Sequence, residues 1–272
     1  MKTRAIPSTG EQIPVIGLGT WQTFDVGTAE SERVPLAAVL RAFSDAGGRL
    51  IDSSPMYGHA EAMVGELRGT VKSPFIATKV WTSGRDRGIQ EMERSARLLR
   101  SEVIDLMQIH NLLDWKTHLQ TLYEWKNEGR IRYTGITHYQ PGAFSKLEKI
   151  MRAKSVDFVQ LPFSIELPDA EERLLPLAAS RGMAVIVNRP FEGGTLFRNV
   201  LHKPLPEWAA EFDCQSWGEL FLRWVVSHPA VTCAIPATRR PEHLQQNVRA
   251  GEGRMLTSAE RSHLRKLVRA SI

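Results

Sequence analysis

Short apolar, β-rich runs alternate with longer segments of helical periodicity along this sequence, and this alternation constrains the fold more than any other feature. Most of the runs start about 25 to 35 residues apart, which is the size of a strand–helix–strand unit. Eight such units favour a (β/α)8 TIM barrel, a fold of typically about 250 residues, over the alternative of a doubly wound sheet. The runs begin near Val15, Leu50, Phe75, Ile104, Tyr133, Phe158, Ala184 and Thr232.

Most gaps between the runs have helical spacing and recognisable helix-end signals. We expect helices over residues 34–46, 90–100, 115–128, 143–151 and 171–180. Glycines suited to a helix C-terminus follow three of them, at Gly47-Gly48, Gly129 and Gly182. Capping boxes begin two later helices, at Ser216-Trp217-Gly218-Glu219 and Thr257-Ser258-Ala259-Glu260. The one long gap predicts an inserted loop after the seventh strand, over residues 191–215.

The N-terminal segment predicts a β-hairpin. Arg4-Ala5-Ile6 and Gln12-Ile13-Pro14 flank the turn residues Ser8-Thr9-Gly10-Glu11. We expect this hairpin to cap the bottom of the barrel, because the N-terminal mouth would otherwise expose apolar side chains. The hairpin and the eight units together use the whole length, so residues 1–272 are expected to form a single barrel domain.

Composition narrows the class of protein and of partner. With 42% hydrophobic and 24% charged residues, the chain is too apolar for a disordered protein. Its 35 Lys and Arg against 30 Asp and Glu give a net charge of only +5, and no basic run is interleaved with aromatic residues. We therefore expect no nucleic-acid partner.

The N-terminus and the cysteines predict a cytoplasmic protein without membrane contact. The basic start is followed at once by Pro7-Ser8-Thr9-Gly10-Glu11, which leaves no apolar region of a signal peptide. No apolar run approaches the roughly 20 residues of a membrane span. Two cysteines, Cys214 and Cys233, can form neither a disulfide framework nor a zinc ribbon, and they suit a reducing compartment.

The residues that end each apolar run are the candidates for chemistry, because TIM barrels carry their active sites at the C-terminal ends of the strands. Asp52, Lys79 and His110 end the second, third and fourth runs. Each alone has an ordinary explanation, as a helix cap, a solvated rim residue or a structural histidine. If the three ionisable side chains are buried close together, they indicate a functional site that binds or stabilises charge. The later runs end in Thr137-His138, Gln160, Asn188-Arg189-Pro190 and Pro236-Ala237-Thr238.

Tyr57 follows Asp52 by five residues and supplies a proton donor. A phenol has an unperturbed pKa of about 10. A neighbouring Lys79 ammonium would lower that pKa by stabilising the phenolate, and Asp52 would hold the ammonium in place. His110 on the other side would orient a carbonyl oxygen. Together these groups would protonate an oxygen as charge develops on it.

Five stretches of the sequence carry a family resemblance. They are Gly17-Leu18-Gly19-Thr20-Trp21, Ile51-Asp52-Ser53-Ser54-Pro55-Met56-Tyr57-Gly58, Thr78-Lys79-Val80-Trp81, Leu106-Met107-Gln108-Ile109-His110 and Ile235-Pro236-Ala237-Thr238-Arg239-Arg240-Pro241-Glu242-His243-Leu244-Gln245-Gln246-Asn247. In these stretches the chain resembles the aldo-keto reductase superfamily, and the resemblance covers essentially its whole length.

The resemblance implies hydride transfer from NADPH to an aldehyde or ketone. It makes Tyr57 the general acid, Asp52 and Lys79 the pair that tunes its pKa, and His110 the group that orients the carbonyl. It also implies a cofactor extended over the C-terminal mouth. In agreement, no G-x-G-x-x-G motif opens a helix after a strand in this sequence.

The resemblance also implies a set of cofactor-binding residues, with NADPH favoured and NADH as the alternative. The set is Gly19, Thr20, Trp21, Asp52, Thr137, His138, Gln160, Asn188, Arg189, Pro190, Ile235, Pro236, Thr238, Arg239, His243, Gln246 and Asn247.

Three parts of that set depart from the family pattern. Thr137-His138 stands where Ser-Asn is usual, and Asn188 or Arg189 stands where a tyrosine often stacks on the nicotinamide. A guanidinium can also stack or pair with the pyrophosphate, so Arg189 is a partial substitute. At the 2′-phosphate, Ala237 replaces a residue that is often basic and His243 one that is commonly arginine. The remaining donors there are Thr238, Arg239 and Arg240, where the eighth helix would begin.

Three tryptophans follow the first, third and fourth strands: Trp21, Trp81 and Trp115. We expect them to line an aromatic substrate pocket, the alternative being ordinary aromatic core. Many relatives carry a long C-terminal tail over this pocket, whereas here the last helix is expected to end near Ile272. That predicts an open pocket and loose selectivity for small-molecule carbonyl substrates. Separately, we expect a monomer or a weak homo-oligomer.

Three other functions compete with carbonyl reduction. A metal-dependent hydrolase would use His110 and His138, but such sites need further ligands, so we expect no metal. A Schiff-base aldolase would use Lys79 as nucleophile, which leaves Tyr57 and His110 without a joint role. A cofactor-binding regulatory subunit without significant turnover is the non-enzymatic alternative.

Overall fold

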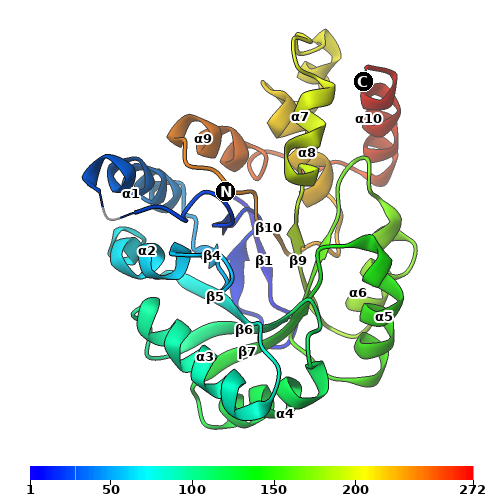
Figure 1. Cartoon of the computed structure of the whole chain (residues 1–272). Coiled ribbons are helices and arrows are strands. Elements are labelled where there is room, and N and C mark those ends of the chain that lie inside the picture. The colour runs from blue at the N-terminus through cyan, green and yellow to red at the C-terminus, as the bar shows by residue number, and fades with distance from the viewer. Residues whose placement is uncertain (28, 272) are drawn as a thin grey trace.

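The computed structural model describes residues 1–27 and 29–271, and a sheet of eight parallel strands forms its centre. The strands follow one another around the sheet in chain order (Figure 1). Parallel bridges join Ile16 to Ala234 and Gly19 to Ala237, so the first and last strands meet and the sheet closes. The predicted (β/α)8 barrel is confirmed, and the doubly wound alternative is wrong. The strands are β3 (Leu18–Gly19), β4 (Leu50–Asp52), β5 (Phe75–Val80), β6 (Ile104–His110), β7 (Ile131–Thr137), β8 (Phe158–Pro162), β9 (Ala184–Asn188) and β10 (Cys233–Ala234).

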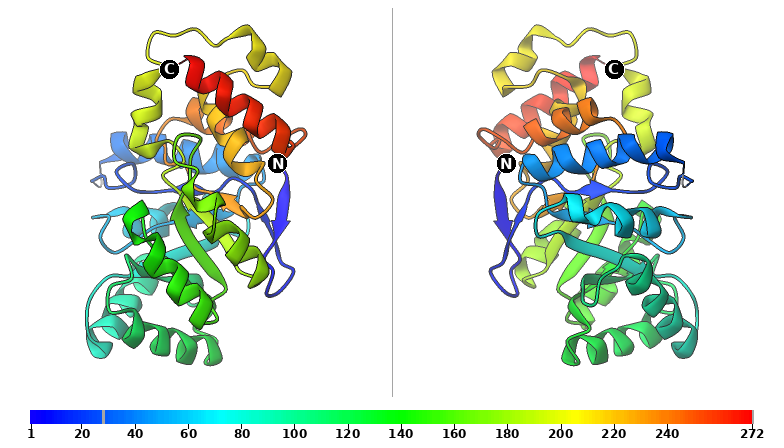
Figure 2. Two further views of the ribbon diagram at one scale, coloured as in Figure 1. Left: turned by 90° about the vertical axis from the view of Figure 1, so that its right-hand side faces the viewer. Right: turned by 90° about the vertical axis from the view of Figure 1, so that its left-hand side faces the viewer.

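Helices between the strands surround the barrel (Figure 2). The predicted end signals are confirmed, because Gly47, Gly129 and Gly182 take positive φ angles just beyond their helices. Ser216 Oγ also accepts the N–H of Glu219 at 3.2 Å, as a capping residue does. The helices are α1 (Glu30–Asp45), α2 (Ala60–Leu67), α3 (Arg85–Leu98), α4 (Trp115–Asn127), α5 (Phe144–Ala153), α6 (Leu174–Ser180), α7 (Thr195–Asn199), α8 (Trp217–Val226), α9 (Pro241–Arg249) and α10 (Ser258–Ser271).

Two segments differ from the prediction. Helix α2 lies where no helix was expected; it is only eight residues long, too short for a clear periodic signal, and is held by burial of Met63 and Val64. The stretch 191–215 is more than a loop, because it contains α7 and two short 3-10 helices. The 3-10 helices of the chain are η1 (Arg68–Thr70), η2 (Pro141–Ala143), η3 (Asp169–Glu171), η4 (Glu192–Gly194) and η5 (Glu207–Phe212).

The N-terminal hairpin closes the bottom of the barrel, as predicted. Strands β1 (Thr3–Ala5) and β2 (Gln12–Pro14) pair antiparallel. Ile6 and Ile13 are fully buried and pack on residues that begin the barrel strands, such as Phe75 and Phe158. The turn adds a hydrogen bond of 2.7 Å between Thr9 Oγ1 and the Tyr133 hydroxyl. Because the hairpin covers the N-terminal ends of the strands, a binding site can open only at their C-terminal ends.

Among the described residues, no helix is long and apolar enough to cross a lipid bilayer. Cys214 and Cys233 are both buried free thiols. Helix α10 is described as far as Ser271, so its expected end at Ile272 lies outside the described residues.

Candidate active site

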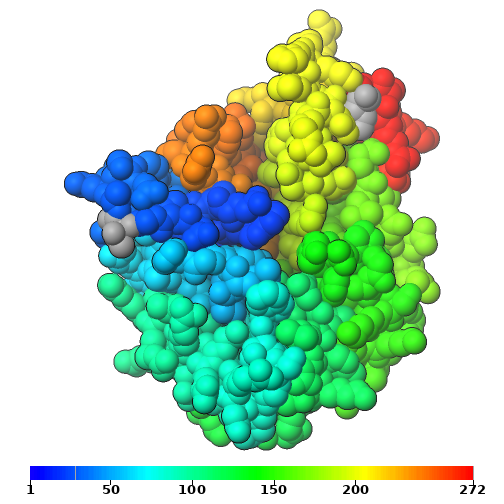
Figure 3. Space-filling model, viewed as in Figure 1, coloured from blue at the N-terminus to red at the C-terminus, as the bar shows by residue number. Residues whose placement is uncertain are grey.

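A cleft of about 800 Å³ opens at the C-terminal ends of the strands. The surface is hollowed beside the segment that follows β9, drawn in yellow (Figure 3). The cleft is lined by Gly19, Thr20, Trp21, Gln22, Thr23, Asp52, Met56, Tyr57, Trp81, His110, Asn111, Thr137, Tyr139, Gln160, Asn188, Arg189, Pro190, Phe191, Gly193, Gly194, Phe197, Ile235, Pro236 and Ala237.

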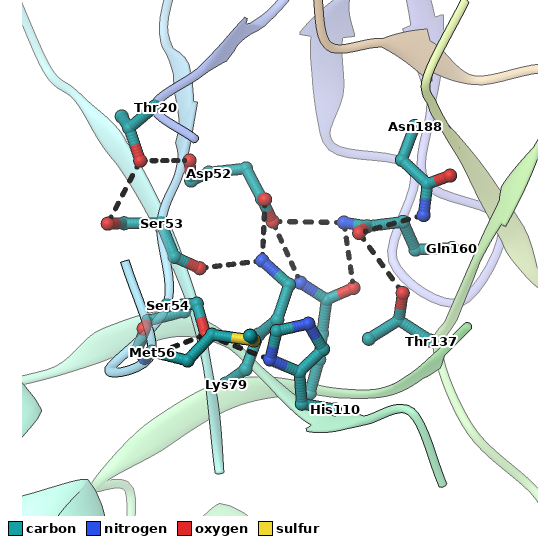
Figure 4. Close-up of polar contacts among 12 residues, drawn as sticks. Thr20, Asp52, Ser53, Ser54, Met56, Lys79, His110, Thr137, Gln160 and Asn188 are labelled. Carbon is teal, nitrogen blue, oxygen red and sulfur yellow. Dashed lines mark hydrogen bonds and ion pairs between the residues drawn. The ribbon is translucent and has the colours of Figure 1, made fainter. Parts of the chain in front are cut away.

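A buried ion pair lies at the base of the cleft. Lys79 Nζ donates to Asp52 Oδ2 at 2.6 Å and to the backbone carbonyl of Ser53 at 2.6 Å, and both charged side chains are almost fully buried (Figure 4). Burial alone would lower the pKa of Lys79, but the adjacent Asp52 carboxylate offsets this and the pKa is raised above its ordinary value. Lys79 is therefore a cation and not a free amine, which argues against the aldolase.

The other carboxylate oxygen of Asp52 is held by two glutamines. Asp52 Oδ1 accepts hydrogen bonds from Gln108 Nε2 at 3.0 Å and Gln160 Nε2 at 2.9 Å. Gln160 Oε1 in turn accepts from Thr137 Oγ1 at 3.1 Å and from Asn188 Nδ2 at 3.3 Å. One hydrogen-bond network thus links the ends of β4, β6, β7, β8 and β9 (Figure 4).

Tyr57 lies close to both Lys79 and His110. Lys79 Nζ is 5.1 Å from the centroid of the Tyr57 ring, and the Tyr57 and His110 rings meet edge to face with centroids 5.9 Å apart. The expectation that Lys79 lowers the pKa of Tyr57 holds for that interaction alone. Burial has the larger effect, so the pKa of Tyr57 is raised overall. The phenol therefore keeps its proton at neutral pH.

His110 is neutral at the end of β6. Burial lowers its pKa to about 2, and the charges of Lys79 and His138 act in the same direction. Its Nδ1 lies 2.9 Å from Ser54 Oγ. Ser54 and Gln108 are site residues that sequence reasoning missed. Gln108 carried a usable signal, because it precedes His110 by two residues and so faces the same side of the strand.

The cleft brings together part of the predicted cofactor set. The predicted residues that line it are Gly19, Thr20, Trp21, Asp52, Thr137, Gln160, Asn188, Arg189, Pro190, Ile235 and Pro236. The predicted residues that lie outside its lining are His138, Thr238, Arg239, His243, Gln246 and Asn247. All but His138 of this second group lie in or just before α9, and His138 stacks on Tyr139 with ring centroids 5.7 Å apart.

Two of the three predicted pocket tryptophans line the cleft. Trp21 and Trp81 do so and are 43% and 41% exposed. Trp115 is not brought to the cleft, because a tight turn with left-handed backbone at Asp114 places it as the first residue of α4, packed against the core. Sequence reasoning missed other apolar side chains of the lining: Met56, Tyr139, Phe191 and Phe197.

The hydrolase alternative needs His110 and His138 to share a metal ion with further ligands. Within residues 1–27 and 29–271, no group of three or more His, Cys, Asp or Glu side chains is arranged to hold a metal ion.

The buried ion pair predicts an asymmetry in stability. Asp52→Ala leaves the Lys79 ammonium buried without its partner, so we expect the free energy of unfolding to fall by about 3–5 kcal/mol. Adding Lys79→Met to Asp52→Ala removes the orphaned charge and should recover most of this loss. Glu124→Ala, which breaks the exposed pair with Arg85, should cost less than about 1 kcal/mol. Urea unfolding measures all three; equal losses for Asp52→Ala and Glu124→Ala would contradict the account.

Comparison with known proteins agrees with this geometry. A model of the Aldo/keto reductase family matches residues 15–269. The chain is 29% identical over 275 residues to methylglyoxal reductase YeaE of Escherichia coli (strain K12), which covers 98% of this chain and 95% of that protein. It is 25% identical over 294 residues to aldo-keto reductase YhdN of Bacillus subtilis (strain 168), with coverage of 90% and 87%. The crystal structure of an aldo/keto reductase from Klebsiella pneumoniae in complex with NADP and acetate matches with a TM-score of 0.80 at 25% identity, covering 98% of this chain and 96% of that one. The chain belongs to the aldo/keto reductase family.

Proposed function

We propose that this protein reduces aldehydes and ketones to alcohols with NADPH, and that Tyr57 is the general acid. The observation that carries the proposal is the convergence of Asp52, Lys79, Tyr57 and His110 from three strand ends and one loop at the base of a single cleft. A neutral phenol and a neutral imidazole beside a buried cation form a set that can donate a proton to an oxygen and stabilise the charge that remains.

The residues at the mouth of the barrel fit a dinucleotide. Asn188 Oδ1 is buried without a hydrogen-bond partner next to Gln160 and Thr137, so this cluster has unused capacity for a carboxamide. Arg239 and Arg240 are exposed where α9 begins, and neither is paired with a carboxylate of the described chain. Bound NADPH would supply the hydride, and the Klebsiella pneumoniae protein of the same family was crystallised with NADP.

We assign the parts of the cofactor to different strand ends. Thr137, Gln160 and Asn188 would bind the nicotinamide carboxamide. Arg189, whose guanidinium carbon lies 5.6 Å from the centroid of the Tyr139 ring, would face the nicotinamide or the pyrophosphate. Thr238, Arg239 and Arg240 would bind the 2′-phosphate at the N-terminus of α9. The other residues proposed to contact the cofactor are Gly19, Thr20, Trp21, His138, Pro190, Ile235, Pro236, His243, Gln246 and Asn247.

The chain's own residues divide the proton chemistry among them. Tyr57 donates its hydroxyl proton to the carbonyl oxygen as negative charge develops there. The Lys79 ammonium stabilises the phenolate left behind, and Asp52 keeps that ammonium in position. His110 donates a hydrogen bond to the same oxygen and orients the carbonyl. Trp21 and Trp81 form apolar walls at the open end, which fits small carbonyl compounds of varied shape.

Replacing the proposed acid tests the mechanism. Tyr57→Phe removes the hydroxyl and keeps the ring, so carbonyl reduction should fall by at least about 100-fold. Binding of NADPH, followed by fluorescence titration, should stay within about twofold of the wild type. Retention of full activity would overturn the role of Tyr57.

A second substitution tests the proposed phosphate site. Arg239→Ala should lower the preference for NADPH over NADH by about tenfold, because an exposed arginine–phosphate contact is lost. Arg181→Ala, on the surface after α6, serves as the control and should leave the preference unchanged. Steady-state kinetics with both cofactors measures the ratio. An unchanged ratio in Arg239→Ala would count against the phosphate role.

The shifted pKa values of His110 and Tyr57 predict how kcat/KM depends on pH. His110, with a pKa of about 2, is neutral above that pH, and Tyr57, with its raised pKa, stays protonated well past neutrality. The kcat/KM for reduction should therefore be level from about pH 5.5 to about pH 8.5. Oxidation of an alcohol needs the phenolate and should rise toward alkaline pH. An inflection near pH 6.5 that is lost in His110→Gln would contradict this account.

A further inference from the structure

We propose that Ser54 is a positioning residue whose hydroxyl fixes His110 in the tautomer that carries its proton on Nε2. The inference rests on the proposed function, because it gives the carbonyl-orienting group its donor. The hydrogen bond between Ser54 and His110, however, is present with or without turnover.

Ser54 lies in the short segment between Asp52 and Tyr57 and is fully buried. Its Oγ is 2.9 Å from His110 Nδ1, at the end of β6 (Figure 4). The same oxygen accepts the backbone N–H of Met56 at 3.4 Å. Ser54 therefore links the loop that carries Tyr57 to the imidazole on a different strand.

The direction of the bond between Ser54 and His110 follows from counting protons. A serine hydroxyl has one proton to donate and two lone pairs to accept with. Among the described residues, His110 Nδ1 is the one acceptor within hydrogen-bond distance of Ser54 Oγ. If Nδ1–H donated to Oγ, the hydroxyl proton would be left buried without an acceptor, which folded proteins avoid. The arrangement that satisfies both groups has the Ser54 O–H donating to Nδ1.

The consequence for the cleft follows from the charge of the ring. His110 is neutral, since burial and the nearby Lys79 disfavour its protonated form, so it carries a single N–H. With Nδ1 accepting, that proton must be on Nε2. Nε2 has no partner among the described residues, and His110 lines the cleft beside Tyr57. The ring thus presents a donor to a carbonyl oxygen, whereas the other tautomer would present a lone pair and repel it.

Nuclear magnetic resonance tests the tautomer without any turnover. In protein labelled with 15N-histidine, the His110 signals are those lost in His110→Gln. The wild type at neutral pH should show a protonated Nε2 and an unprotonated Nδ1, and Ser54→Ala should shift the Nδ1 resonance because its hydrogen bond is gone. A wild-type ring protonated on Nδ1 would overturn the proposal.

Kinetics tests the consequence for catalysis. Ser54→Ala should lower kcat/KM for an aldehyde about tenfold, the rate equivalent of about 1.4 kcal/mol, with NADPH affinity unchanged. Ser54→Thr keeps a hydroxyl and should restore kcat/KM to within about threefold of the wild type. The control is Ser95→Ala, which removes another fully buried hydroxyl, bonded to Glu61 at 3.0 Å outside the cleft, and should leave kcat/KM unchanged.

The outcomes separate this inference from the proposed function. Wild-type activity in Ser54→Ala, together with an unshifted Nδ1 resonance, would overturn the role of Ser54 and leave Tyr57 as the acid. A wild type that turns over no carbonyl would contradict the proposed function, while its His110 resonances would still decide the tautomer.

Discussion

The buried contact between Asp52 and Lys79 is the interaction on which the rest of the site depends. Two opposite charges removed from water are stable only when every remaining hydrogen-bonding position is filled. Here the second oxygen of Asp52 is held by Gln108 and Gln160, and the ammonium also reaches the carbonyl of Ser53. Together with Asp52 and Lys79, these partners come from β4, β5, β6, β8 and the residue after β4, so the charge pair is satisfied only when these strands are assembled side by side in the barrel.

Burial shifts the pKa values of two side chains beside that pair in opposite directions. Burial raises the pKa of Tyr57 and lowers the pKa of His110, so both are neutral beside a fixed cation. In the proposed mechanism, the neutral phenol donates its proton, and the cation beside it would stabilise the phenolate that remains. The same burial that makes Lys79 costly to accommodate is what makes its charge effective, because water does not screen it. Stability and proposed function thus draw on one interaction.

The barrel and the convergence of the ionisable residues could be predicted from the sequence. Strand period and unit length indicate eight parallel strands, and parallel strands carry the residues after them to one mouth. Asp52, Lys79 and His110 therefore could be predicted to meet at one mouth from their positions at the ends of consecutive strands. The hairpin could likewise be predicted to lie at the opposite mouth, where Ile6 and Ile13 are buried.

What could not be predicted depends on turns and on side-chain direction. Trp115 follows a strand, as Trp21 and Trp81 do, but a left-handed turn at Asp114 directs it to the core. The hydroxyl of Ser54 meets His110 only through the course of the loop after β4, which has no periodic signal. The balance of burial against charge at Tyr57 likewise needs coordinates, because the two effects have opposite signs.

The most direct test of the central claim is to mix wild-type protein saturated with NADPH with a panel of aldehydes and ketones, and to follow NADPH absorbance and alcohol formation together. We predict that NADPH is consumed once the carbonyl compound is added, and that one molecule of alcohol forms for each molecule of NADPH oxidised. Tight binding of NADPH with no consumption across the panel would contradict the account and would point to a cofactor-binding subunit without turnover.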